Sequence, residues 1–337
     1  MRDSRFKITT VTPNPALDKV LWIDGFQTGK VNRVVEMRVD PGGKGINVSR
    51  FLSKLGKHTR ATGFMGRGHA PFLIEQLSRE SIETDFVDVS GYVRMNLKII
   101  DRVNGCETEI NEPGPAVCEA EVSALEDKVR LSCEDSSVIV FAGSLPPGCP
   151  TDLYYRLIAL ANQRGVRTIL DASSDALREG LRAAPFLVKP NLQELEELFG
   201  TRFQRDTEII DAAREIVRSG VKIVVVSMGS DGAIAVARGW SVGDSAGEGA
   251  PAKGSAVPVR AWRAFAPEVR VGNTVGAGDA MVAGLAASLA RCDDIATALK
   301  FAVAAGSAAA SDPGTGQYSV ELARHLQSEV VLTQVSS

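Results

Sequence analysis

The stretch Lys222-Ile-Val-Val-Val-Ser227 decides the fold, because four consecutive β-branched apolar residues stand between its lysine and its serine. A short apolar run without polar alternation is typical of a strand buried on both faces of a parallel sheet. Similar strands are predicted at Lys7–Thr12, Thr59–Met65, Ser137–Phe141, Arg167–Leu170 and Phe186–Lys189. Helices are predicted at Lys44–Gly56, Pro71–Glu80, Glu119–Ser132, Thr151–Gln163, Asn191–Phe199 and Thr207–Ser219. This alternation predicts an α/β fold whose mostly parallel sheet has helices on both faces.

Two segments interrupt the alternation. Residues 19–37 and 86–111 have the β character of hairpins, with no helix between their strands. Because both lie between core segments, we expect them to pair as a small sheet that acts as a lid. The alternative is an edge extension of the main sheet. The expected organisation is one domain over residues 1–337, with a lid at about 19–37 and 86–111.

Composition excludes several classes of protein. The 337 residues carry a net charge of −3 without a basic run, so no nucleic-acid partner is expected. No stretch of about 18 apolar residues is free of charge, and the first residues do not resemble a signal peptide, so we expect a cytoplasmic protein without a membrane span. Five widely spaced cysteines predict reduced thiols that are packed in the interior, and three histidines argue against zinc or a histidine-dependent triad. Acid–base chemistry is therefore expected from carboxylates.

The stretch Asn273-Thr-Val-Gly-Ala-Gly-Asp279 is a glycine turn that leads directly into an apolar helix. The first N–H groups of a helix have no intrahelical acceptor, so those of Gly276, Ala277, Gly278 and Asp279 are predicted to bind an anion. Asp279, in the first helical turn, is a candidate general base beside that anion. The alternative is a turn with an ordinary helix cap. A second, alanine-rich helix is predicted at Asp294–Ala310.

A second glycine cluster lies in Pro41-Gly-Gly-Lys-Gly-Ile-Asn-Val-Ser49. Gly42 and Gly43 permit close approach of a ligand to the backbone, while Lys44 and Asn47 supply a cation and a two-way hydrogen-bonding group. Both glycine clusters lack the final glycine of a dinucleotide-binding fingerprint, and no phosphate-binding loop of the Walker type occurs. If the chain handles phosphate, it does so with another kind of site.

Polar residues follow several of the predicted strands or glycine turns, namely Asp18, Ser144, Asn191, Ser227 and Asp279. Ligands of α/β folds bind beyond the carboxyl ends of the strands, so these side chains are expected at one rim of the sheet. Asn191 and Glu194, three residues apart at a helix start, suit a hydrated Mg²⁺ ion, although taken alone the pair is better explained by a helix cap. Residues 243–258, rich in Gly, Ala, Ser and Pro, are predicted to form a loop.

From about Thr10 to Gly316 the chain resembles the ribokinase-type sugar kinases, also called the phosphofructokinase B family. The resemblance is carried by Gly42–Ser49 and Asn273–Asp279, in this order and spacing. The segments Thr12–Asp18 (TPNPALD), Thr108–Pro115 (TEINEPGP) and Lys189–Glu194 (KPN-x-x-E) resemble its 1-phosphofructokinase and tagatose-6-phosphate kinase branch. The resemblance implies a three-layer sandwich with a mostly parallel central sheet and a small β-sheet lid.

The same resemblance implies roles for individual residues. Asp279 would be the general base, and the anion hole would be formed by Gly276, Ala277 and Gly278. The sugar phosphate would be bound by Asp18, Gly42, Gly43, Lys44, Asn47, Arg94 and Ser144. ATP would be bound by Lys189, Asn191, Ser227, Gly229, Gly232 and Gly278. Glu194 would hold Mg²⁺ through water. Asn273 and Val275, with the turn at residues 312–316, would bind a monovalent cation such as K⁺.

We therefore expect ATP-dependent phosphorylation of a ketohexose phosphate, first of all fructose 1-phosphate to fructose 1,6-bisphosphate. Tagatose-6-phosphate kinase and 6-phosphofructokinase are the alternatives within the class. A kinase for an unphosphorylated sugar or nucleoside is a further alternative, but a neutral substrate would not need the cations Lys44 and Arg94. A non-catalytic sugar-phosphate sensor is another, but it would not need Asp279. An oxidoreductase fits least well. An open edge of the lid sheet, together with the resemblance, predicts a homodimer.

Overall fold

The computed structural model describes residues 7–239, 258–312 and 319–335. Its main sheet is built in the order β15 (Val331–Val335), β14 (Val259–Phe265), β13 (Ala233–Arg238), β12 (Ile223–Ser227), β11 (Leu187–Val188), β10 (Arg167–Asp171), β9 (Ser136–Ala142), β1 (Lys7–Thr12), β4 (Thr59–Gly68) and β5 (Glu83–Thr84), with β6 (Val87–Tyr92) also paired to β4. Pairing is parallel from β12 across to β5 and antiparallel from β12 through β15. The sheet is therefore mostly parallel, as the sequence predicts.

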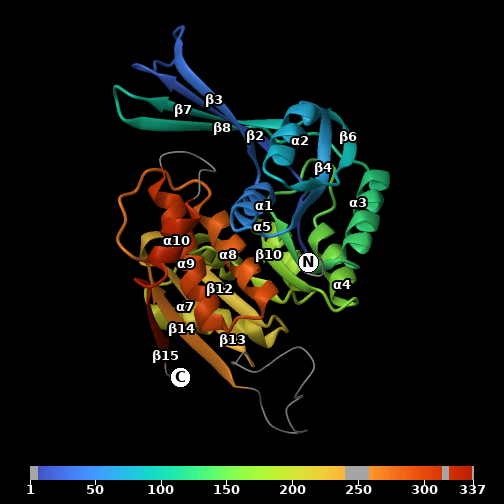
Figure 1. The fold of residues 1–337 in the computed structure, drawn as a ribbon, viewed down its shortest axis with the longest axis vertical. Coiled ribbons are helices and arrows are strands. Elements are labelled where there is room, and N and C mark those ends of the chain that lie inside the picture. The colour runs from blue at the N-terminus through green and yellow to red at the C-terminus, as the bar shows by residue number, and fades with distance from the viewer. Residues whose placement is uncertain (1–6, 240–257, 313–318, 336–337) are drawn as a thin grey trace.

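Helices cover both faces of this sheet (Figure 1). One face packs against α1 (Lys44–Lys54), α8 (Ala277–Arg291), α9 (Ile295–Ser311) and α10 (Val320–Leu326), and the other against α3 (Glu119–Ser132), α4 (Leu153–Asn162), α5 (Ser174–Leu181), α6 (Leu192–Phe199) and α7 (Asp206–Arg218). α2 (Ala70–Arg79) packs beside β4. Along β12, Val225 belongs to the first core and Val224 and Val226 to the second, which is why this strand is apolar at successive positions.

The six predicted strands and six predicted helices are confirmed, with ends that differ by a few residues. The alanine-rich helix is also confirmed, as α9. The short helices α5 and α10 were not predicted; in α5, SDALREGL, only two leucines and an alanine are apolar and a glycine precedes the last residue. The loop predicted at residues 243–258 lies outside the described residues except for Pro258.

A separate small sheet projects from one end of the molecule (Figure 1). Its order is β3 (Val34–Gly42), β2 (Ala16–Ile23), β7 (Arg94–Asp101) and β8 (Cys106–Asn111), with β2 and β7 parallel. The two segments without helices therefore do pair with each other. The pairing begins earlier than residue 19 on one side and only at Arg94 on the other, because β6 joins the main sheet through β4.

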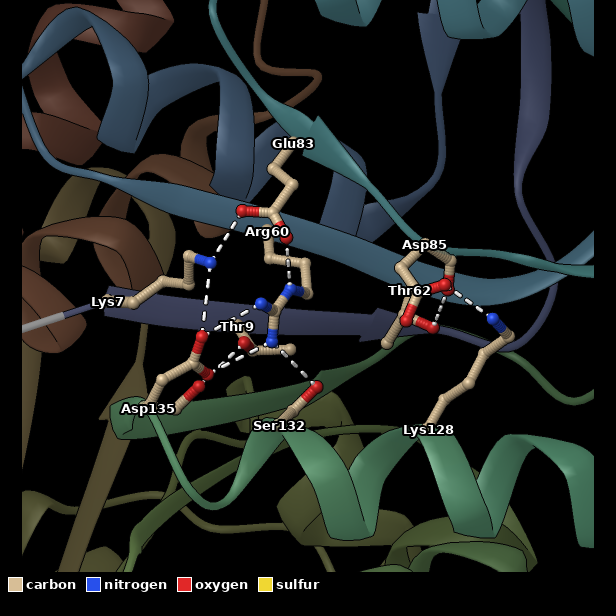
Figure 2. A network of polar contacts seen from close by, with 10 residues as sticks. Lys7, Thr9, Arg60, Thr62, Glu83, Asp85, Lys128, Ser132 and Asp135 are labelled. Carbon is tan, nitrogen blue, oxygen red and sulfur yellow. Dashed lines mark hydrogen bonds and ion pairs between the residues drawn. The ribbon is translucent and has the colours of Figure 1, made fainter.

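The amino ends of β1 and β4 are joined by a network of charges (Figure 2). Lys7 Nζ lies 2.5 Å from Glu83 Oε2 and 3.2 Å from Asp135 Oδ2. Arg60 contacts the same two carboxylates at 2.7 and 2.8 Å. Since each of these cations faces two anions, the network ties β1, β4, β5 and the start of β9 together. No helix among the described residues is long and apolar enough to cross a membrane.

Close packing of α8 on α9 fixes the helix that carries Asp279. A Cβ atom on Gly284 would lie only 3.0 Å from the Cα atom of Ala302. We therefore expect Gly284→Val to lower the free energy of unfolding by about 1–3 kcal/mol, the usual cost of overpacking a core. Urea unfolding monitored by circular dichroism measures this change. Glu215→Val, on the exposed side of α7, is the control; an equal loss in both variants would contradict the packing argument.

Candidate active site

Two cavities meet at the carboxyl ends of the parallel strands. The larger, of about 960 Å³, lies between the ends of β10, β11 and β12 and the helices α8 and α9. The smaller, of about 230 Å³, lies between α1 and the small sheet. Lys44 and Asp279 line both cavities. A group bound in one cavity can therefore reach a group bound in the other at these two side chains.

The start of α8 supplies N–H groups at this junction. Gly276 has a left-handed conformation, with φ of 87°, which turns the chain into the helix. The N–H of Ala277 donates to the carbonyl of Thr274 at 3.2 Å. The N–H groups of Gly276, Gly278 and Asp279 have no acceptor among the described residues. Three of the four predicted N–H groups are thus available to an anion, and the positive end of the helix dipole favours one.

Asp279 lies in the first turn of α8 and is only 7% exposed. Its Oδ2 accepts a hydrogen bond of 2.8 Å from Asn47 Nδ2, which comes from α1. Burial, followed by the nearby charge of Asp171, raises the pKa of the Asp279 carboxyl to about 6. A carboxylate with this pKa is a better proton acceptor near neutral pH than an ordinary surface aspartate.

Asp171, at the end of β10, was not predicted from the sequence as a site residue. Its side chain is 1% exposed, and its Oδ1 lies 3.1 Å from Lys44 Nζ and 3.4 Å from Lys189 Nζ. Burial opposes ionisation, but the two lysines outweigh it and hold the pKa of Asp171 below its usual range. Its position directly after the predicted strand Arg167–Leu170 is the signal that identified the other rim residues and would have identified this one.

Lys44 is shared among carboxylates. Besides Asp171, its Nζ lies 3.6 Å from Glu194 Oε1. Burial disfavours the ammonium form, but the charges of Asp171, Glu194 and Asp279 outweigh this effect and raise the pKa of Lys44 above its ordinary value. Lys44 therefore stays positively charged at the junction of the two cavities.

The smaller cavity brings together several residues predicted for the sugar phosphate. Asn96, on β7 opposite Asp18, donates from Nδ2 to Asp18 Oδ1 at 2.8 Å. Arg94 donates to Asn96 Oδ1 at 3.3 Å and to the carbonyl of Asn14 at 3.2 Å. Burial raises the pKa of Asp18. A Cβ atom on Gly42 would lie 2.3 Å from the Asp18 carboxylate, so this position needs glycine.

The larger cavity is lined by all six residues predicted for the nucleotide, Lys189, Asn191, Ser227, Gly229, Gly232 and Gly278. Asn191 and Ser227 pair through a single parallel bridge, which joins the ends of two neighbouring chain segments. Gly232 has φ of 91°, and a Cβ atom there would lie 2.2 Å from the carbonyl oxygen of Ala264. Glycine is thus required for the turn that borders this cavity.

Arg263, which was not predicted, holds that turn from β14. Its guanidinium donates to the carbonyl of Asp231 at 2.6 Å and to Asp206 Oδ2 at 2.8 Å, and it stacks 4.3 Å from the centre of the Phe265 ring. An isolated arginine in the sequence carries no pattern that would have indicated this role.

Four predicted residues lie outside both cavity linings, namely Gly42, Ser144, Glu194 and Asn273. Glu194 accepts the N–H of Asn191, and Asn191 Oδ1 accepts the N–H of Glu194, so the pair forms a capping box at the start of α6. Ser144 lies outside both cavity linings, with its Oγ 3.4 Å from Asn14 Nδ2. Asn273 Oδ1 accepts the Val275 N–H at 3.0 Å, and Val275 itself lines the smaller cavity. Residues 313–318, which include most of the predicted cation-binding turn, lie outside the described part of the chain.

This fold and this junction of two cavities are those of a ribokinase-like kinase, and comparison with known proteins gives the family. The pfkB family of carbohydrate kinases matches residues 14–322, and the chain belongs to this family. The 1-phosphofructokinase of Borreliella burgdorferi is 36% identical over 303 residues, 90% of this chain and 91% of that protein. The 1-phosphofructokinase of Bacillus subtilis is 33% identical over 328 residues, 97% of this chain and 100% of that protein.

Solved structures agree with this assignment. Phosphofructokinase-2 of Escherichia coli in complex with potassium has a TM-score of 0.84 and 31% identity, covering 96% of this chain and 99% of that chain. A tetrameric inhibited form of the same protein has a TM-score of 0.82 and 31% identity over the same shares. The chain is therefore a carbohydrate kinase with the ribokinase-like α/β fold.

The raised pKa of Asp279 predicts how activity depends on pH. If Asp279 accepts a proton, only its ionised form is active, so kcat/KM should rise with pH and level off above about 6. Asp171→Asn removes a negative charge that raises this pKa, and should move the rise to lower pH. Initial rates from pH 4.5 to 8.5 measure both, with thermal unfolding as the control for stability. A flat profile through pH 6 in the wild type would contradict the assignment.

Proposed function

We propose that this kinase transfers the terminal phosphoryl group of ATP to fructose 1-phosphate and forms fructose 1,6-bisphosphate. The observation that carries the proposal is the position of Lys44 and Asp279, which line both cavities. The smaller cavity also contains Arg94, a cation suited to the phosphate of the sugar. Both curated relatives described above are 1-phosphofructokinases at more than 30% identity over most of the chain.

The proposed mechanism follows from this junction. The sugar occupies the smaller cavity, and its reacting hydroxyl lies beside Asp279. Asp279 takes the proton as the hydroxyl oxygen attacks the γ-phosphorus of ATP, and the bond from that phosphorus to the bridging oxygen breaks, which releases ADP. The free N–H groups of Gly276, Gly278 and Asp279, with the ammonium of Lys44, stabilise the negative charge on the transferred phosphoryl group. Asn47 orients the Asp279 carboxylate through its hydrogen bond. Most of the catalysis is thus positioning and electrostatic stabilisation.

ATP and Mg²⁺ are proposed as the cofactors. The larger cavity has the size of a nucleotide site, with polar groups and glycines near the strand ends and apolar side chains such as Val269 and Val303 further out. The buried Oδ2 of Asp171 has no hydrogen-bond partner among the described residues, which suits a hydrated Mg²⁺ ion that Glu194 would help to hold. When bound, Mg²⁺ would neutralise part of the negative charge of the ATP phosphates. No cluster of three metal-ligating side chains occurs in the described residues.

A monovalent cation, K⁺, is proposed near Asn273 and Val275. Its support is the family resemblance and the potassium complex of the Escherichia coli structure. Residues 1–337 are proposed to act as one kinase domain, with the small sheet as a lid that excludes water from the smaller cavity. A cytoplasmic location agrees with five cysteines that are all free, although Cys106, Cys118 and Cys292 are exposed and not packed as predicted.

The substrate is tested by ADP release with ATP and Mg²⁺, comparing fructose 1-phosphate, fructose 6-phosphate, tagatose 6-phosphate and fructose. We expect the highest kcat/KM with fructose 1-phosphate. Asp279→Asn should lower kcat by about 10²–10⁴-fold, the usual contribution of a general base. Asp127→Asn, on the exposed side of α3, is the matched control and should leave kcat unchanged.

Each other outcome identifies another function. Preference for fructose 6-phosphate or tagatose 6-phosphate would indicate the other kinases of this group. Binding of fructose 1-phosphate without turnover of any of the four compounds would indicate a sugar-phosphate sensor. Wild-type turnover in Asp279→Asn would remove Asp279 from the mechanism.

A homodimer is proposed through the small sheet. Its edge strands β3 and β8 expose Met37 and Ile110, 63% and 54% exposed, and exposed edges favour pairing with a second copy. We expect the double variant Met37→Glu, Ile110→Glu to sediment as a monomer where the wild type sediments as a dimer. Val103→Glu, in the turn between β7 and β8, is the control and should sediment as the wild type does. A wild-type monomer in sedimentation velocity would contradict the proposal.

A further inference from the structure

One face of the small sheet forms a wall of the smaller cavity. Side chains alternate between the two faces of a sheet, and strand register decides which of them are neighbours. Asp18 lies opposite Asn96, and Val20 opposite Lys98. On the other side of β7, Asn96 lies opposite Asn111 and Lys98 opposite Glu109. By this alternation Lys98 belongs to the same face as the polar pair Asp18–Asn96, and all six residues line the cavity, together with Lys19 and Leu97 from the intervening positions.

Lys98 is a cation in this wall whose ion-pair partner is an exposed carboxylate. Its side chain is 14% exposed, and its Nζ lies 2.5 Å from Oε2 of Glu107. Glu107 belongs to β8 and is itself 55% exposed. A pair with an exposed carboxylate is weak, because water competes for both groups. A phosphate dianion that enters the cavity would bind the ammonium more strongly than Glu107 does.

Three other cations line this cavity. Lys19 lies opposite Leu97, at the intervening positions of the sheet. The charges of Lys44 and Arg94 add to the attraction of a phosphate, but both side chains already contact the protein. Lys44 is held at the junction by Asp171 and Glu194. Arg94 donates to the carbonyls of Asn14 and Glu112 as well as to Asn96.

Lys98 is four residues further along β7 than Arg94, about 13 Å at the usual rise of a strand. Arg94 is the end of β7 nearer the junction, because it pairs with Ala16, which also pairs with Gly42 just before α1. Lys98 therefore lies further from Asp279, on the side where a sugar whose hydroxyl reacts at Asp279 carries its own phosphate.

We propose that Lys98 recognises the phosphate already present on the substrate, and that this phosphate displaces Glu107 from Lys98. The exchange selects a phosphorylated ketohexose over the unphosphorylated sugar. It also connects substrate binding to β8, because Glu107 is released when the phosphate is bound. This inference rests on the proposed function, and it adds a specificity-determining residue to it.

Lys98→Met tests the proposal by keeping the length of the side chain and removing its charge. We expect KM for fructose 1-phosphate to rise by about 10–100-fold, the equivalent of one charged hydrogen bond. The kcat value and KM for ATP should stay within about threefold, and the preference for fructose 1-phosphate over fructose should fall by the same factor as kcat/KM. Lys98→Arg should recover most of the affinity. Arg102→Ala removes a neighbouring cation paired with Asp24 outside the cavity, and should change none of these values.

Glu107→Gln tests the exchange itself. Because Glu107 competes with the phosphate, this variant should lower KM for fructose 1-phosphate by about two- to fivefold, an effect of the size seen for exposed ion pairs. In a Lys98→Met background the same change should have no effect, since the two residues then no longer interact. If Lys98 had only a structural role, Lys98→Met would not change the preference between fructose 1-phosphate and fructose, and the effect of Glu107→Gln would not depend on Lys98. Equal effects of Glu107→Gln in both backgrounds would overturn the exchange.

Calorimetric binding of fructose 1-phosphate separates this inference from the proposed function. Turnover by the wild type, with Lys98→Met binding fructose 1-phosphate as tightly as the wild type, would overturn the role of Lys98 and leave the function standing. Binding that depends on Lys98 without turnover would support the recognition residue and overturn the kinase assignment for this substrate. Absence of both binding and turnover in the folded wild type would overturn both.

Discussion

The carboxylate of Asp171 is the interaction on which the site depends. It is buried at the end of β10, where an unpaired charge would be very costly, and it is stabilised by the ammonium groups of Lys44 and Lys189. These three side chains come from β10, α1 and the end of β11, so one set of charges fixes three segments that are far apart in the sequence. The same negative charge helps to raise the pKa of Asp279. The charge of Asp171 therefore both holds the lysines of the site in position and raises the proton affinity of Asp279.

The remainder of the fold holds this cluster in place. The parallel strands end together and direct Asp171, Lys189 and Asn191 toward one rim. On one face of the sheet, α8 is buried along its alanine- and glycine-rich length against α9, which fixes where its first turn begins. A helix start with free N–H groups is useful only if it cannot shift, and the close contact of Gly284 with Ala302 prevents such a shift.

The sequence predicted the fold well because its signals are local. The apolar run at Lys222–Ser227 and the glycine turn before Asp279 need no knowledge of distant contacts. Asn96 and Lys98 could not be predicted in this way, since their roles depend on the register of β7 against β2 and β8. Asp171 is different, because its position after a predicted strand was visible, whereas its pairing with two lysines was not.

The two cavities are built from different parts of the molecule, and this division has an evolutionary consequence. The larger cavity is formed by the main sheet and its helices, whereas much of the smaller one is formed by residues of β2, β7 and β8. Substitutions at the polar positions of these three strands change the wall presented to one ligand and leave Asp171 and Asp279 in place. A single ancestral scaffold can therefore diverge to accept new sugars through a few exchanges in a small sheet, while its phosphoryl donor and its chemistry are inherited unchanged.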